Sequence, residues 1–261
     1  RHKWRPMLSG PTLKKILAEK KVHTDGLVVD TTRPTVTKTR VMAGGQATVR
    51  QQVVRIDRES KAPLDKAVEQ QLLDYIKANI DKMDAVVMSD YGIKAISDAI
   101  MRLVIDSCRR RSIPCIVDSR YNILAFSGVT LVKQNEAEVA TALGYETLDD
   151  VSLLQAGKRL LAVMQAEAIM ITRGPEGMSL FERTDKVTHI PVTNVSEVFD
   201  ATGAGDTAVV TAALALASGA SYLEATRLAN FAAGLVVKKP GTATTSLAEL
   251  KEAVGRYHEN C

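Results

Sequence analysis

Apolar residues recur along this chain at the spacing of amphipathic helices. Leu64, Val68, Leu72, Ile76 and Ile80 lie four positions apart, with polar residues between them. Residues four apart share one face of a helix, so this stretch is predicted to be helical. The same reasoning predicts helices at residues 12–20, 95–111, 135–143 and 150–165, two apolar helices after position 203, and a last helix that begins near Ser246 with Glu249 in capping-box position.

Short apolar runs alternate with these helices and predict strands. The runs are DAVVMSD (84–90), PCIVD (114–118), VTLVKQ (129–134), AIMITR (168–173) and MSLFER (178–183). Strands that alternate with amphipathic helices are typical of an α/β fold, with a mainly parallel sheet and helices on both faces. The whole chain, residues 1–261, is expected to form one such domain.

One stretch near the start does not follow this alternation. The β-rich runs TVTKTRVM (35–42) and QATVRQQVVRID (46–57) flank Gly44 and Gly45. Two such runs around a Gly-Gly pair predict a β-hairpin, which we expect to form a small lid over about residues 34–58. Lys38, Arg40 and Arg55 would give one face of it a positive charge.

Composition and charge exclude several classes of protein. The chain has 261 residues, 46% of them hydrophobic, and a formal charge of +4, which is mild for this length. Its longest apolar stretch, AVVTAALALA at 208–217, is too short for a bilayer and is expected to be a buried helix. The three cysteines form no paired framework, which favours a reduced, cytoplasmic protein. The basic run CRRR at 108–111 has no stacking aromatic beside it, so we expect neither a nucleic-acid nor a membrane partner.

The stretch FDATGAGDTAVV at 199–210 carries the strongest chemical signal. Gly203 and Gly205 allow a close turn, and the apolar run after Asp206 predicts the start of a helix. Free N–H groups at a helix N-terminus bind anions. A carboxylate beside such a site makes sense as a base that takes a proton from a hydroxyl attacking a bound phosphoryl group. A simple helix N-cap is the alternative.

These motifs resemble those of one known family. DATGAGD is similar to the D-T-x-G-A-G-D signature of the ribokinase-like (PfkB) carbohydrate kinases, and NEAE (135–138), TRGPEG (172–177) and NFAAGLVVKKPGTATTS (230–246) are similar to further motifs of that family, in the same order. The resemblance implies a ribokinase-like, Rossmann-like fold and a kinase that uses ATP and Mg²⁺. It leaves a monovalent-cation requirement open.

The resemblance implies roles for individual residues. Asp206 would be the catalytic base, and Gly203, Ala204 and Gly205 the anion hole. Glu138 would organise the metal, acting through water. The residues implied in nucleotide binding are Asn135, Thr172, Gly174, Gly177, Asn230 and Gly241.

Within the family, the chain is most similar to the heptose 7-phosphate kinases. HTDGLVVD, RPTVTKTRVMA, VVRIDRE, SDYG and GTATTS carry this likeness. It implies phosphorylation of the anomeric hydroxyl of D-glycero-D-manno-heptose 7-phosphate to the 1,7-bisphosphate, a step towards ADP-heptose and the lipopolysaccharide core. A kinase for another sugar or nucleoside, or a nucleotide-binding module without activity, is the alternative.

The sequence offers fewer clear candidates for binding the sugar substrate than for binding the nucleotide. Arg40 and Arg55 are candidates to bind the substrate's phosphate, although a solvated strand face would explain them equally. Asp90 and Lys94 are candidates to contact the sugar, with Lys94 displaced by one position from the family's usual S-D-Y-G-K-G. Asp118, which ends another strand, would be explained equally by a turn cap. The family's N-terminal strands have no counterpart here, and the resemblance implies a homodimer formed through the lid.

Overall fold

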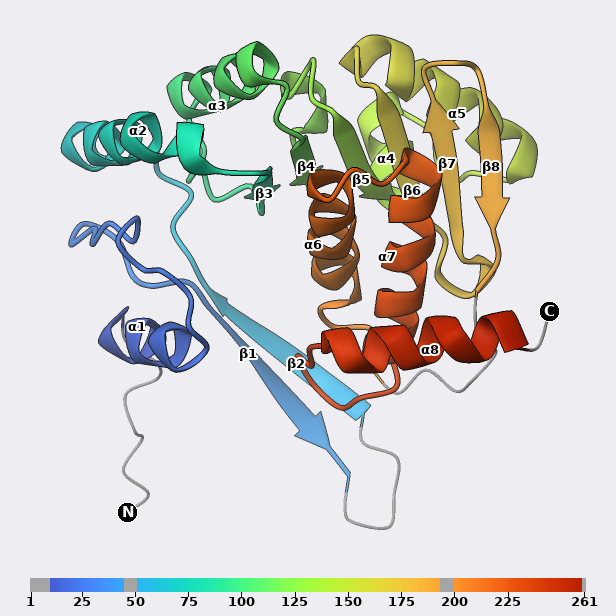
Figure 1. Cartoon of the computed structure of the whole chain (residues 1–261). Helices are drawn as coiled ribbons and strands as arrows, with labels where there is room; N and C mark the ends of the chain where they lie inside the picture. Colours follow the sequence, from blue (N-terminus) through green and yellow to red (C-terminus); the bar gives the residue numbers. More distant parts are fainter. Residues whose placement is uncertain (1–9, 45–50, 193–199, 260–261) are drawn as a thin grey trace. The chain divides into compact units, whose positions relative to one another are not determined.

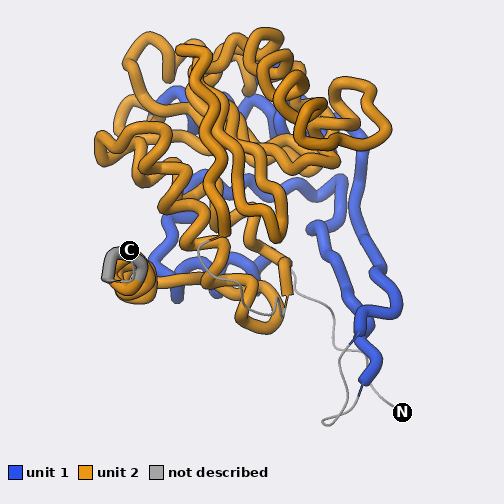
Figure 2. The backbone as a smooth tube through the Cα atoms, turned by 90° about the vertical axis from the view of Figure 1, so that its right-hand side faces the viewer, with its two compact units in different colours: residues 1–78, 93–100 blue, residues 79–92, 101–261 orange. Residues whose placement is uncertain are grey.

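The computed structural model describes residues 10–44, 51–192 and 200–259. The chain divides into two compact units (Figure 2), one of residues 1–78 and 93–100 and one of residues 79–92 and 101–261. Each unit is described by itself. The expectation of a single domain stays a prediction.

The larger unit is built on a six-stranded sheet (Figure 1). Its strands follow chain order: β3 (Val86–Asp90), β4 (Cys115–Ser119), β5 (Leu131–Asn135), β6 (Ala168–Thr172), β7 (Met178–Glu182) and β8 (Val187–Ile190). The first four are parallel, and β7 and β8 are antiparallel to their neighbours. The mainly parallel sheet is therefore confirmed. The sequence analysis did not predict β8, nor that β7 and β8 would be antiparallel. The two strands are antiparallel because the connections before them are too short to contain a crossover helix.

Helices cover both faces of this sheet, as predicted. Helices α4 (Glu136–Leu143) and α5 (Asp150–Met164) pack on one face, and α6 (Ala204–Ala217) and α7 (Tyr222–Val236) pack on the other (Figure 1). Under α6 and α7 the core is formed by Ile116, Leu131, Met170, Leu180 and small side chains of the two helices. On the opposite face, Gly157 of α5 leaves room for the ring of Phe181, which would lie 2.3 Å from an added Cβ.

Helix α6 corrects one expectation. It was predicted to be buried, and Ala208, Val209 and Ala212 are buried against the sheet. On its other side, however, Val210 is 49% exposed and Leu214 is 65% exposed. The helix therefore presents an apolar stripe to solvent, because its sequence is apolar around the whole circumference while the sheet covers one side.

The last helix begins where the sequence predicted. Helix α8 (Leu247–Glu259) follows Ser246, whose backbone N–H and hydroxyl donate to Glu249 Oε2 while the Glu249 N–H donates to Ser246 Oγ. The Lys239 ammonium also binds Glu249, and these contacts lower the pKa of Glu249 to about 2. The capping box therefore fixes the segment that links α7 to α8.

The remaining elements are short helices. The smaller unit contains α1 (Gly10–Glu19) and α2 (Lys66–Asn79), and helix α3 (Asp98–Arg111) begins in this unit and continues into the larger one. Single 3₁₀ turns lie at Ile80–Lys82, Ile123–Ala125 and Gly174–Glu176. Within residues 10–44, 51–192 and 200–259, no helix combines the length and apolarity needed to cross a membrane.

The smaller unit also contains the predicted hairpin. Strands β1 (Thr37–Ala43) and β2 (Gln51–Arg58) pair antiparallel, which confirms the two strands, while part of the turn between them lies outside the described residues. Val41 faces Val54 across the ladder, and Arg40 faces Arg55. Because side chains alternate between faces, one face of the hairpin is apolar and the other is charged.

Candidate active site

The residues DATGAGD (200–206), which the sequence marked as a candidate site, lie at the N-terminus of helix α6, while Phe199 lies outside the described residues. Gly203 is the N-cap residue and has φ +86°, a left-handed conformation that favours glycine. The N–H of Ala204 donates to the Ala201 carbonyl. Of the predicted anion hole, Ala204 is thus engaged in the turn, whereas the N–H groups of Gly203 and Gly205, and of the neighbouring Asp206, have no acceptor among the described residues.

The two carboxylates of this motif have different surroundings. Asp200 accepts the N–H of Thr202 through Oδ1 and the N–H of Gly241 through Oδ2, at 2.8 and 3.1 Å. It therefore ties the α7–α8 connection to the glycine turn. Asp206 is exposed, and its two oxygens lie 2.9 and 3.2 Å from the hydroxyl of Tyr91. A hydroxyl group thus already donates to the carboxylate that was predicted to be the base.

Tyr91 reaches Asp206 from the loop that follows β3. The left-handed Gly92, with φ +72°, follows it in a tight turn. Burial, together with the hydrogen bond to Asp206, raises the pKa of the Tyr91 phenol well above its ordinary value. The phenol therefore stays protonated and donates to Asp206 throughout the neutral range.

A buried ion pair lies beside the same helix terminus. Lys133 of β5 places its ammonium 3.0 Å from Oδ2 of Asp118, which is on β4. A Cβ built on Gly205 would come within 2.8 Å of this ammonium. Burial raises the pKa of Asp118, the Lys133 charge opposes that shift, and the nearby Asp206 carboxylate adds to it. The pair therefore belongs to the same charged cluster as the predicted base.

The N-x-x-E element forms a capping box at the start of α4. Asn135 Oδ1 accepts the N–H of Glu138 at 2.8 Å, and Glu138 Oε2 accepts the N–H of Asn135 at 2.9 Å. Burial raises the pKa of Glu138, and the Asn135 N–H opposes the shift. The two residues thus hold each other in place, and Glu138 Oε1 has no protein donor among the residues that the structure describes.

The predicted nucleotide loop lies on the neighbouring strand. Thr172 ends β6 directly opposite Asn135 in the parallel ladder. Gly174 and Gly177 both have positive φ, +54° and +87°, and the Arg173 N–H closes the loop onto the Gly177 carbonyl. The carboxyl ends of β5 and β6 therefore bring Asn135, Thr172 and this loop together, as the fold class predicted.

Asn230 and Gly241 each donate a hydrogen bond to a residue far away in the sequence. Asn230 is buried in α7, and its side-chain amide donates to the Pro191 carbonyl at 2.7 Å. Gly241 is held by Asp200, as described above. Their roles in adenine binding stay predictions.

Asp90 has little capacity left for a ligand. It is 8% exposed, Oδ1 accepts the Gly92 N–H, and Oδ2 accepts the Ser119 hydroxyl. These bonds connect the ends of β3 and β4 and favour a structural role. A contact between Asp90 and sugar therefore stays a prediction that its hydrogen bonds do not favour.

The other acceptor-side candidates belong to the smaller unit. Lys94 is exposed and adopts a left-handed conformation, with φ +55°. Arg55 binds Asp57 of its own strand through Nε at 2.9 Å. Arg40 is exposed and has no ionic partner within residues 10–44 and 51–100. It lies directly opposite Arg55, so the two guanidinium groups are cross-strand neighbours, and Asp57 partly neutralises this pair.

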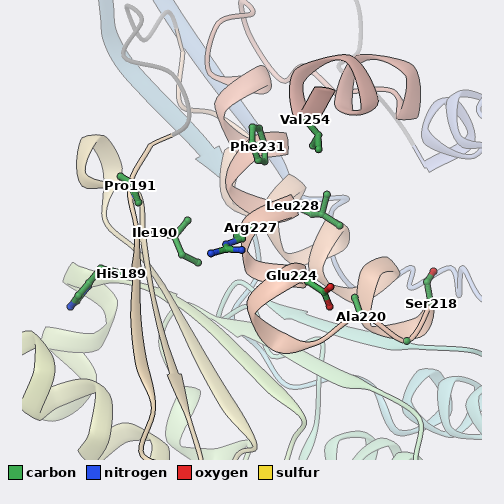
Figure 3. Close-up of a pocket in the computed structure, with 11 residues that line it drawn as sticks. His189, Ile190, Pro191, Ser218, Ala220, Glu224, Arg227, Leu228, Phe231 and Val254 are labelled. Atoms are coloured by element: carbon green, nitrogen blue, oxygen red, sulfur yellow. The ribbon is translucent and has the colours of Figure 1, made fainter. Parts of the chain in front are cut away.

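A large pocket lies elsewhere on the larger unit. It has a volume of about 720 Å³ and lies beside β8, α7 and α8 (Figure 3). Ile190, Leu228, Phe231 and Val254 give it apolar walls, and Arg227 extends from α7 toward Ile190. None of the predicted site residues lines it. The candidate site is therefore defined by the helix terminus and the strand ends.

Sequence reasoning did not single out Lys133 or Tyr91. Lys133 directly follows the apolar residues Leu131 and Val132 within β5, and a charge inside a buried strand is a signal for a buried pair. Tyr91 gave no comparable signal, because only the fold brings its loop next to Asp206.

Comparison with known proteins shows the family to which the chain belongs. Residues 9–249 match the family model described as pfkB family carbohydrate kinase. A bifunctional protein HldE from Geobacter sulfurreducens is 40% identical over 251 residues, which cover 96% of this chain and 50% of that protein. The chain thus spans about half the length of the curated relatives it matches.

Solved structures show the same fold. A potassium complex of phosphofructokinase-2 from Escherichia coli has a TM-score of 0.73 at 20% identity, covering 95% of this chain and 79% of that one. Ribokinase from Arabidopsis thaliana, complexed with ribose and ATP, has a TM-score of 0.70 at 20% identity, covering 95% and 80%. The fold is ribokinase-like. By its family match, the chain belongs to the PfkB family of carbohydrate kinases, enzymes that transfer a phosphoryl group to a sugar hydroxyl.

Proposed function

We propose that this chain is an ATP-dependent sugar kinase whose acceptor is the anomeric hydroxyl of D-glycero-D-manno-heptose 7-phosphate. The product would be the 1,7-bisphosphate. The relatives named HldE support the heptose, together with the motifs in which this chain resembles heptose 7-phosphate kinases. The observation that carries the chemistry is the exposed Asp206 carboxylate beside free N–H groups at the start of α6.

The reaction follows from that geometry. The sugar hydroxyl takes the place of the Tyr91 hydroxyl on Asp206 and gives its proton to the carboxylate. The sugar oxygen then bonds to the γ-phosphorus of ATP, the bond from that phosphorus to the β–γ bridging oxygen breaks, and ADP leaves. The free N–H groups of Gly205 and Asp206 hold the oxygens of the migrating group, so catalysis consists of positioning and electrostatic stabilisation.

The family implies a divalent metal, and the residues present fit Mg²⁺ carried in by ATP. Mg²⁺ keeps much of its water and binds through one or two carboxylates and the phosphates of the nucleotide. Glu138 can contribute through water, because Oε2 is held by Asn135 while Oε1 is free of protein donors in the described ranges. When bound, Mg²⁺ would neutralise phosphate charge. A monovalent cation, as in the potassium complex of phosphofructokinase-2, is compatible with this proposal.

The nucleotide would bind along the ends of β5 and β6. Thr172 and the loop closed by Gly174 and Gly177 would contact the phosphates or ribose. Asn230 and Gly241 would form part of the adenine wall, on segments that Pro191 and Asp200 hold in place.

The charged face of the hairpin would bind the phosphate that the substrate already carries. Arg40 and Arg55 lie directly opposite each other, so both guanidinium groups could donate to one phosphate. Replacing both by glutamine is expected to raise the KM for the sugar phosphate about 10-fold or more while the KM for ATP changes less than twofold. Steady-state kinetics measures both constants. Equal changes in the two would contradict the phosphate role, and the Arg58→Gln variant of the same strand is the control.

The apolar face of the hairpin would form a homodimer. Val41, Val54 and Ile56 lie on this face and are 43%, 47% and 56% exposed. Exposed apolar patches of this kind mark interaction surfaces. Replacing Val54 by aspartate is expected to convert a dimer to a monomer in light scattering at micromolar protein concentration. A dimer that persists in this variant would place the interface elsewhere.

The function itself is tested by ADP release. The chain is incubated with Mg-ATP and a panel of sugars, sugar 7-phosphates, sugar 6-phosphates and nucleosides. Heptose 7-phosphate is expected to give the highest kcat/KM, with the 1,7-bisphosphate as product. A higher value for another acceptor would reassign the substrate. ATP binding without any phosphorylated acceptor would favour a nucleotide-binding module without activity.

A further inference from the structure

Lys133 is buried at the carboxyl end of β5 with its ammonium group under-used. Its side chain is 7% exposed, and its one hydrogen bond among the described residues goes to Asp118 Oδ2 at 3.0 Å. An ammonium group has three donors, so two N–H bonds remain without an acceptor in a buried place. Such a group is costly unless something else accepts those bonds.

The unused donors lie against the first turn of α6. A Cβ on Gly205 would be 2.8 Å from Lys133 Nζ and 3.5 Å from its Cε. Gly205 has an ordinary helical backbone rather than a positive φ, so its turn does not require glycine. Glycine at this position leaves the lysine ammonium in place, whereas a Cβ would displace it.

The position of the Lys133 ammonium beside the N-terminus of α6 does not by itself stabilise the fold. The N-terminus of a helix carries partial positive charge, and a cation there is repelled. Asp118 offsets part of this cost, and Asp206, Glu138 and Arg120 are the other charged groups that act on this cluster. An anion held at the helix terminus would remove the repulsion, accept the free ammonium donors and use both sources of positive charge.

We propose that Lys133 is a catalytic residue that donates to oxygens of the γ-phosphoryl group of ATP at the N-terminus of α6. Asp118 anchors the lysine, and Gly205 admits it. The lysine donates to the γ-phosphoryl oxygens while that group passes from ATP to the sugar oxygen, ADP leaves and Asp206 takes the hydroxyl proton. The role rests on the proposed kinase function, but binding of the nucleotide tests it independently of the acceptor.

The central experiment compares Lys133→Met with the double variant Lys133→Met/Asp118→Asn. The single variant leaves a buried carboxylate without its partner, so a loss of activity could come from a damaged fold. The double variant removes both charges and is expected to fold, with a melting temperature close to that of the parent. Its turnover is nevertheless expected to stay at least about 100-fold below the parent, as for other preorganised donors to a transition state.

A binding measurement separates this role from the sugar chemistry. Calorimetric titration with ATP and with ADP is expected to show ATP affinity about 10-fold weaker in the double variant and ADP affinity nearly unchanged. Arg183→Met, which removes a cation paired with Glu167 next to the start of β6, is the control and should leave both affinities at the parent's values. Loss of the ATP preference supports the assignment even if the acceptor proves to be a different sugar.

A second variant keeps the test decisive if the double variant does not fold. Gly205→Ala leaves both charges in place but pushes the ammonium away, and it is expected to weaken ATP binding as the loss of Lys133 does. Adding Gly205→Ala to Lys133→Met should then cause little further loss. Parental turnover and parental ATP preference in the double variant or in Gly205→Ala would overturn the proposal and leave Lys133 as half of a structural ion pair.

Discussion

Replacing Asp206 by asparagine is expected to lower sugar-dependent ADP release by roughly 10³-fold, within the usual range for loss of a general base. Asparagine has nearly the same shape and still accepts a hydrogen bond from Tyr91, but it cannot take the hydroxyl proton. Because Asp206 is exposed and makes no ion pair in the described part of the chain, the fold should be unaffected. Rapid-quench measurement of ADP and calorimetric titration of ATP test turnover and binding separately.

Tyr91→Phe is the matched control for this experiment. It removes the hydroxyl that donates to Asp206 at 2.9 Å but leaves the carboxylate in place. We therefore expect turnover to fall less than about 10-fold, since in the proposed reaction the sugar hydroxyl replaces the Tyr91 hydroxyl on Asp206. An asparagine variant that turns over at the parent's rate would show that Asp206 is not the base. Equal losses in the two variants would show that the tyrosine contact, and not proton removal, is what matters.

The order of helices and strands could be predicted because the spacing of apolar residues that marks a helix or a strand is visible within a short stretch of sequence. Each strand predicted for the larger sheet lies within two residues of its observed bounds, and the helix starts near Ser246 and Glu136 coincide with capping boxes. Strand β8 was missed because VTHI is short and has no strict alternation. The exposure of Val210 and Leu214 could not be predicted either, since an apolar sequence does not say which side of a helix is covered.

The geometry of the candidate site could be predicted where it depends only on residues that are neighbours in one motif. The glycine turn before α6, with Asp206 in its first turn, is such a case. The contacts that complete the site come from other strands. Tyr91 follows β3, and Lys133 on β5 binds Asp118 on β4. These residues lie far from Asp206 in sequence, and only the parallel register brings the strand ends to one edge.

A substitution in the nucleotide loop is expected to have the largest effect on stability. Gly177 has φ +87° and ψ −123°, a region essentially open to glycine alone. A Cβ at this position would lie 2.1 Å from the Ile190 carbonyl oxygen and 2.7 Å from the Pro191 carbonyl carbon. These atoms belong to the backbone at the end of β8 and cannot move aside without breaking the ladder between β7 and β8. Gly177→Ala is therefore expected to destabilise the fold by about 3 kcal/mol or more.

Gly174 provides the comparison within the same loop. It also has a positive φ, +54°, but an added Cβ meets nothing within 4 Å, so Gly174→Ala should cost only about 1 kcal/mol. For a chain of this length the two costs correspond to falls in Tm of roughly 6–12 °C and 2–4 °C. Thermal unfolding followed by circular dichroism measures the difference. Similar Tm values for the two variants would mean that the close approach of β8 to Gly177 is absent in solution, and with it the contact that closes the nucleotide loop against the sheet.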